Sequence, residues 1–200
     1  MPDPIDFHFD FSSPYGYLMS ERIDSLAARF DRKVHWKPML LGVVYKQLDS
    51  QPLPSIPMKG PYSLHDIRRS ARHLGIALRI PDPFPVATQH AARAYYWLHD
   101  RDCAIARAFA HGVFRAYFVD GRDISRKDVV VELAAGAGAD ADACDRALDD
   151  DAVKQRLKEA CSEALAAGVF GSPFVIVDGE PFWGVDRLDQ IERWLAEGGF

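Results

Sequence analysis

The stretch that decides the fold lies near the N-terminus, where residues 5–18 read IDFHFDFSSPYGYL. Its first seven residues alternate between apolar and polar side chains, a period of two that predicts a strand. Ser13 and Pro14 then suit the start of a helix, the serine as N-cap and the proline at the first helical position. Helical apolar spacing continues over residues 15–30, and residues 33–39 predict a second strand. A strand, a helix and a strand in this space predict a βαβ unit with parallel strands.

The middle of the chain changes to helical patterning. Ser125 with Asp128 predicts a capping box, and Gly168 predicts the end of the last helix of this region. After a proline-rich stretch, apolar stripes predict six helices, over residues 62–74, 87–99, 103–118, 126–136, 141–148 and 150–167.

The C-terminal part returns to strand patterning. Residues 173–177 are apolar and β-branched, Asp178-Gly179 predicts a hairpin turn, and residues 180–183 can pair back. Apolar residues at helical spacing from Leu188 to Leu195 predict a closing helix. The chain is therefore predicted to be an α/β protein with a small mixed sheet and a large helical block.

The order of segments and the composition limit the class of protein. We expect residues 1–55 and 166–200 to form one discontinuous βαβ…ββα domain, and residues 56–165 to form an all-helical insertion. The 200 residues are 48% apolar and carry a net charge of −5, which is ordinary for a folded chain and argues against nucleic acid as a partner. No apolar run reaches the ~18 residues of a membrane span, and the acidic N-terminus lacks a secretory pattern. These features predict a cytoplasmic protein that does not bind membranes.

Residue types that often carry chemistry are scattered. Cys103, Cys144 and Cys161 form no C-x-x-C pair, and each falls on an apolar helical face, which predicts buried and inert thiols. The seven histidines show no H-x-x-x-H or H-E-x-x-H spacing, and the aspartates show no calcium-loop order. We therefore expect no metal site.

Two short motifs leave a functional interpretation open. Ser12-Ser13-Pro14 lies where a strand ends and a helix begins, a place that favours a negative charge. A plain N-cap role for Ser13 is the simpler explanation of the local sequence. Ser172-Pro173 precedes a strand, where a cis peptide bond can occur.

Taken together, the segments resemble the thioredoxin-like fold of DsbA type. DsbA proteins carry C-P-H-C at the helix start, where this chain has Ser13-Pro14-Tyr15-Gly16, and disulfide exchange at that position needs a thiolate. The serine version of the motif resembles the glutathione-dependent 2-hydroxychromene-2-carboxylate isomerases and the related kappa-class glutathione transferases. Further matches to these families lie at residues 57–62, 169–173 and 182–188.

The resemblance implies a role for each matching residue. Ser13 would be the catalytic residue, whose hydroxyl meets the glutathione sulfur. The backbone at Ser172-Pro173 would pair with the cysteinyl part, and Lys59 would contact the carboxylate region. Val185 and Asp186 would hold the γ-glutamyl end, with Asp186 binding its ammonium group. The chain departs from the family at Ser50, where Asn is frequent, and at Val185, where kappa transferases carry Ser.

The resemblance also implies a reaction. This is the glutathione-dependent isomerisation of 2-hydroxychromene-2-carboxylate to trans-o-hydroxybenzylidenepyruvate, in naphthalene-type aromatic hydrocarbon catabolism, by a homodimer. A kappa-like transferase that conjugates electrophiles and a non-enzymatic glutathione-binding module are the alternatives. An apolar pocket would receive the aromatic substrate, and the candidates to line it are Tyr15, Tyr17, Tyr95, Tyr96 and Trp97.

Overall fold

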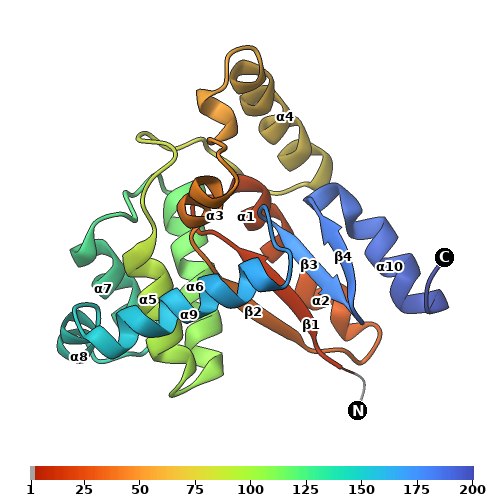
Figure 1. Ribbon diagram of the computed structural model, residues 1–200. Helices are drawn as coiled ribbons and strands as arrows, with labels where there is room; N and C mark the ends of the chain where they lie inside the picture. Colours follow the sequence, from red (N-terminus) through yellow and green to blue (C-terminus); the bar gives the residue numbers. More distant parts are fainter. Residues whose placement is uncertain (1–2) are drawn as a thin grey trace.

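A four-stranded mixed sheet forms the centre of the protein in the computed structural model, which describes residues 3–200 (Figure 1). Its strands are β1 (Ile5–Phe9), β2 (Val34–Pro38), β3 (Phe174–Val177) and β4 (Glu180–Trp183). They follow the order β2-β1-β3-β4. β1 and β2 pair in parallel, as predicted, and the remaining neighbours pair antiparallel. The predicted βαβ…ββα arrangement is confirmed.

The helices include all six that were predicted for the middle of the chain. α4 begins earlier than the prediction, at Lys59. No helix within residues 3–200 is both long and apolar enough to cross a membrane. The helices are α1 (Pro14–Ser20), α2 (Ile23–Ala28), α3 (Leu41–Gln47), α4 (Lys59–Leu74), α5 (Gln89–His99), α6 (Cys103–Phe118), α7 (Lys127–Gly136), α8 (Ala141–Ala147), α9 (Asp151–Ala166) and α10 (Leu188–Glu197), with short 3-10 turns η1 (Leu53–Ser55) and η2 (Val185–Arg187).

The hairpin and the end of α9 follow the predicted turn chemistry. Asp178 and Gly179 both have positive φ, 53° and 88°, as a two-residue turn between twisted strands requires. Gly168, just past the end of α9, has a φ of 79°, which closes a helix at little cost for glycine.

Two local predictions were wrong. The helical run after Pro14 divides into α1 and α2, because Arg22 between them has a φ of −129° that a continuous helix excludes. The capping box at Ser125 does not form, because the Ser125 N–H and hydroxyl both donate to Asp123, at 2.9 and 2.6 Å. α7 begins after Arg126 without a side-chain cap.

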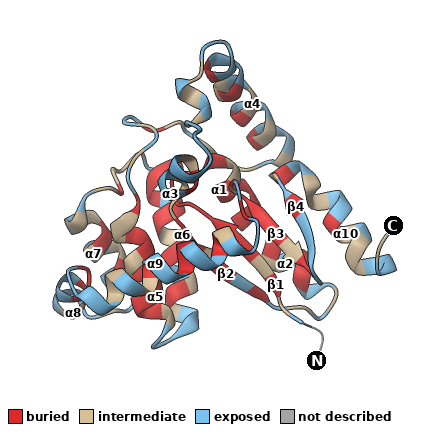
Figure 2. Ribbon diagram, viewed as in Figure 1, coloured by how far each residue is buried: buried red, intermediate tan, exposed pale blue. Residues whose placement is uncertain are grey.

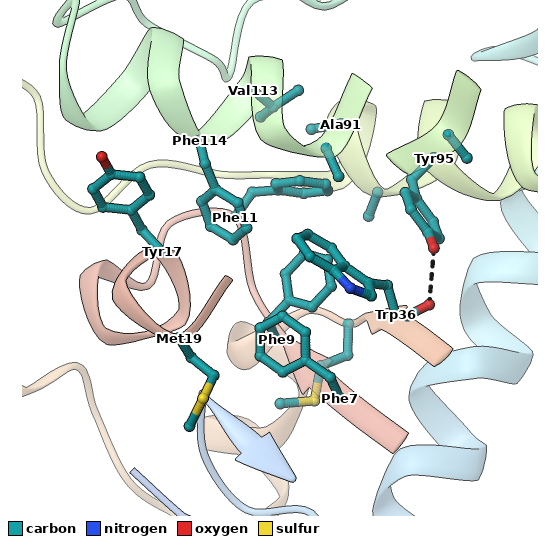
Figure 3. Packing of buried hydrophobic residues seen from close by; sticks show 14 of the residues in the cluster. Phe7, Phe9, Phe11, Tyr17, Met19, Trp36, Ala91, Tyr95, Val113 and Phe114 are labelled. Atoms are coloured by element: carbon teal, nitrogen blue, oxygen red, sulfur yellow. Dashed lines mark hydrogen bonds between the residues drawn. The ribbon is translucent and has the colours of Figure 1, made fainter. Parts of the chain in front are cut away.

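The hydrophobic core lies against β1, whose apolar residues are fully buried (Figure 2). The ring of Phe9 lies 5.3 Å from that of Phe114 on α6 and 5.4 Å from that of Trp36 on β2. Figure 3 shows these rings packed between the sheet and the helices, with Phe11 beside Phe114. The alternation that predicted the strand therefore supplies the apolar face that holds α6 on the sheet.

Most of the aromatic residues predicted to line a substrate pocket belong to this core instead. Tyr17, Tyr95, Tyr96 and Trp97 are exposed by 8% or less. The hydroxyl of Tyr95 donates to the Trp36 carbonyl at 3.0 Å, a bond drawn in Figure 3. The prediction was wrong for these four residues, because their rings fill the contact between helices and sheet. Tyr15 alone among the candidates is only partly buried.

The cysteines separate into two environments. Cys144 and Cys161 are buried, as predicted, and burial raises the pKa of the Cys144 thiol to about 11. Cys103 is exposed, so the prediction of a buried thiol was wrong there. It is the first residue of α6, one turn before the helix reaches the core.

Candidate functional site

Ser13 lies in the loop that joins the end of β1 to α1. Its hydroxyl oxygen accepts a hydrogen bond from the Gly16 N–H at 3.0 Å, and Pro14 occupies the first helical position. The predicted N-cap is therefore confirmed. Only 5% of Ser13 is exposed, so its hydroxyl is held in a largely desolvated place.

A buried carboxylate fixes the loop that carries Ser13. Asp10 is 5% exposed, and its Oδ1 accepts from the Ser12 N–H at 2.8 Å and from the Thr88 hydroxyl at 2.9 Å. Its Oδ2 accepts from the Leu41 N–H at 2.8 Å, which caps the start of α3. Burial raises the pKa of Asp10, and the three hydrogen bonds act against that rise. Asp10 thus joins the loop to α3 and to the residue that precedes α5.

A second segment, at the start of β3, meets the same loop. The Ser13 hydroxyl donates to the Ser172 carbonyl oxygen at 3.0 Å, and the Asp10 N–H donates to Ser172 Oγ at 3.0 Å. The peptide bond between Ser172 and Pro173 is cis, the isomer that the sequence left open. The structure therefore brings together Ser13 and Ser172, which are 159 residues apart in the chain.

Gly16 packs closely against the two serines. A β-carbon at position 16 would lie 3.0 Å from Ser172 Oγ, 3.2 Å from Ser13 Cβ and 3.3 Å from Ser13 Oγ. Contacts this short exclude a side chain larger than hydrogen without some movement of the serines. The two hydroxyl groups that pack against Gly16 are of a kind that can donate to an acceptor such as a glutathione sulfur.

Val185 and Asp186 lie close to the same proline. The Gly184 N–H donates to the Pro173 carbonyl oxygen at 3.1 Å, which ties the segment before η2 to the start of β3. Val185 is buried, whereas the Asp186 side chain is 71% exposed and lies 3.2 Å from the Arg187 guanidinium. The structure thus places an exposed carboxylate on the segment that joins Pro173.

Lys59 belongs to a different element from these residues. It is exposed and begins α4, whose first turn lies at the outer end of the molecule (Figure 1). α4 is held near α1 by its middle, where the Tyr15 hydroxyl donates to Asp66 Oδ2 at 2.6 Å. No cluster of His, Cys, Asp or Glu that could hold a metal ion occurs within residues 3–200.

The sequence interpretation missed three members of the site: Asp10, Thr88 and the side chain of Ser172. Asp10 carried a signal, because it is an acidic residue between Phe9 and Phe11, next to the serine motif. Thr88 carried none, since its partner is 78 residues away in the chain. Ser172 was predicted to act through its backbone, and only the fold shows its hydroxyl beside Gly16.

Comparison with known proteins places this geometry in context. Residues 4–196 match the family model described as the DSBA-like thioredoxin domain. A 2-hydroxychromene-2-carboxylate isomerase of Sphingobium xenophagum is 28% identical, over 98% of this chain and 100% of its own. A glutathione S-transferase kappa 2 of Caenorhabditis elegans is 29% identical, over 96% of this chain and 92% of its own. A solved structure of a 2-hydroxychromene-2-carboxylate isomerase superposes with a TM-score of 0.87 at 26% identity, covering 96% of this chain and 94% of the other.

Proposed function

The chain belongs to the family of DSBA-like thioredoxin domains, and we propose that within it the protein is a glutathione-dependent isomerase rather than a thiol oxidoreductase. The observation that carries the proposal is the hydroxyl of Ser13 at the start of α1, next to the Ser172-Pro173 loop. Neither Ser13 nor Gly16 can form a disulfide, so the family's redox chemistry has no thiol at this position. The proposed substrate is 2-hydroxychromene-2-carboxylate, which relatives of similar length are named for.

Glutathione would be held by the start of α1, the Ser172-Pro173 loop and the segment that carries Val185 and Asp186. The Ser172-Pro173 backbone would pair with its cysteinyl part, and Asp186, beside Val185, would bind the γ-glutamyl ammonium. The exposed Asp186 carboxylate supports this role, because an ammonium group is bound best by an accessible anion. Lys59 would attract a glutathione carboxylate from a greater distance, and its exposure makes this the weakest contact of the set.

Bound glutathione would supply a thiolate that adds to the conjugated system of the substrate; the ring C–O bond would open, the former double bond would rotate as a single bond, and elimination of the thiolate would give the trans product and return glutathione. Ser13 would favour this thiolate by donating a hydrogen bond from its hydroxyl to the sulfur. A free thiol is only a few per cent ionised at neutral pH, and a hydrogen bond to a charged group contributes about 1.5–3 kcal/mol. One such bond therefore lowers a thiol pKa by roughly one to two pH units. To donate in this way, the Ser13 hydroxyl must turn from the Ser172 carbonyl that now accepts its proton.

A kappa-like glutathione transferase is the second candidate, because a relative named as one is 29% identical over nearly the whole chain. Both functions need the same thiolate. They differ in the fate of glutathione, which an isomerase returns and a transferase consumes. Val185 stands where kappa transferases carry Ser, and this favours the isomerase.

The proposal is tested by following the absorbance of 2-hydroxychromene-2-carboxylate with glutathione present at a small fraction of the substrate concentration. We expect complete approach to equilibrium with glutathione recovered. Ser13→Ala should lose most of this rate, whereas Ser25→Ala, which removes an exposed hydroxyl from α2, should keep it. Consumption of one glutathione per product would establish the transferase instead. If the protein binds glutathione but catalyses neither reaction, it is a non-enzymatic glutathione-binding module.

A further inference from the structure

Ser172 carries a second hydroxyl that, like the hydroxyl of Ser13, lies against Gly16. Its Oγ lies 3.0 Å from the point that a Gly16 β-carbon would occupy, and Ser13 Oγ lies 3.3 Å from that point. The Ser172 oxygen is held in place by the Asp10 N–H, which donates to it at 3.0 Å. Two oriented hydroxyl groups therefore lie next to each other beside Gly16 at the start of α1.

The protons of these two hydroxyls are used differently. A serine hydroxyl has one proton to donate and two lone pairs that accept. Ser13 donates its proton to the Ser172 carbonyl and accepts from Gly16. Ser172 accepts from Asp10, and within residues 3–200 no group accepts its proton. Of the two hydroxyls, Ser172 is the one that can donate to a ligand without breaking a bond inside the protein.

Gly16 is what allows the two hydroxyls to lie this close to α1. A methyl group on this residue would lie 3.0 Å from Ser172 Oγ and 3.2 Å from Ser13 Cβ, so it would press against both serines. A glycine inside a helix is destabilising by itself, and this close packing explains its presence in α1.

Building on the proposed function, we propose that the Ser172 hydroxyl donates a second hydrogen bond to the glutathione sulfur, so that two serines hold the thiolate. Ser172 is then a catalytic residue through its side chain, separately from any role of its backbone. Each hydrogen bond to the anion should lower the thiol pKa by roughly one to two pH units. Ser13 and Ser172 would each lower the pKa of the bound thiol in this way.

The test is a pH titration of the thiolate absorbance of glutathione bound to the wild-type protein, to Ser172→Ala and to Ser172→Thr. We expect Ser172→Ala to raise the pKa of the bound thiol by about one pH unit and Ser172→Thr, which keeps the hydroxyl, to restore it. The affinity for S-methylglutathione should stay within about twofold in both variants, because its thioether accepts hydrogen bonds only weakly.

A structural role for Ser172 would give a different pattern. Loss of the bond from Asp10 would then weaken glutathione and S-methylglutathione alike and leave the thiol pKa unchanged, which would overturn the inference. If the wild-type protein binds no glutathione, the proposed function fails and this inference fails with it. If glutathione binds and turns over but the thiol titrates identically in Ser172→Ala, only this inference fails.

A second pair of variants tests the position of the two hydroxyls independently. Gly16→Ala should lower the affinity for glutathione, because its methyl group would displace the hydroxyls of Ser13 and Ser172. Gly112→Ala is the matched control on α6, where a β-carbon would meet no atom within 4 Å, and it should bind as the wild type does. Unchanged binding by a folded Gly16→Ala variant would contradict the inference.

Discussion

His8 should make the protein sensitive to acid. It lies on β1 and is 4% exposed, and neither ring nitrogen has a hydrogen-bond partner within residues 3–200. Burial, helped by the nearby Lys37 and opposed by Asp6, lowers the pKa of His8 from 6.5 to about 4. Between pH 6.5 and 4, His8 is therefore mostly neutral in the native state and mostly protonated in the unfolded chain.

The loss of stability in acid follows from the difference between the pKa of His8 in the unfolded chain, 6.5, and in the folded protein, about 4. The stability that depends on neutral His8 is fully present above pH 6.5 and is lost as the pH falls from 6.5 towards 4. At about 1.4 kcal/mol for each pH unit, the loss reaches about 3 kcal/mol near pH 4. His8→Leu has a similar volume and no titrating group, so it should lose about 3 kcal/mol less than the wild type over this range.

The assay is urea unfolding at several pH values from 7 to 4, with the free energy of unfolding compared between variants. His65→Leu, which replaces an exposed histidine on α4, is the control and should follow the wild-type curve. At pH 7 His8→Leu should be at least as stable as the wild type, because it removes a buried N–H without a partner. Parallel curves for wild type and His8→Leu between pH 6.5 and 4 would refute the reasoning.

Two further substitutions probe the site. Asp10→Asn should lower the free energy of unfolding by about 1–3 kcal/mol, because an amide nitrogen would face the Leu41 N–H and leave a partly buried donor without an acceptor. Denaturant unfolding measures this, and an unchanged midpoint would contradict the account of the Asp10 network. Lys59→Met should weaken glutathione binding by about twofold to fivefold, with the difference shrinking at high salt, since an exposed charge contributes 1 kcal/mol or less. Calorimetric titration at two ionic strengths tests it, with Lys158→Met on α9 as the control, and equal affinities for both variants would remove Lys59 from the site.

The sheet and most helices could be predicted because their signals are local. The alternation in β1, the Asp178-Gly179 turn and the apolar stripes of the middle helices each lie within one segment. α3 could not be predicted in this way. Only Val44 of this helix is buried, and its first N–H is capped by Asp10, 31 residues earlier in the chain. Such a tertiary cap leaves no pattern in the neighbouring sequence.

The site was predictable to the extent that it follows a family motif. The resemblance located Ser13 and the Ser172-Pro173 loop, and the fold brings them into contact. It did not reveal the Asp10 network, which depends on bonds between distant segments. The roles assigned to Lys59 and Asp186, the domain boundaries at residues 55 and 166, the homodimer and the cytoplasmic location stay predictions.

The central claim is that Ser13 activates bound glutathione, and the most direct measurement is the thiolate absorbance of glutathione on binding at neutral pH. We predict that most of the bound thiol is ionised on the wild-type protein and that Ser13→Ala binds glutathione with its thiol largely protonated. Thermal unfolding should confirm that the variant is folded despite losing a cap of about 1 kcal/mol. A bound thiol that is equally ionised on both proteins would contradict the claim.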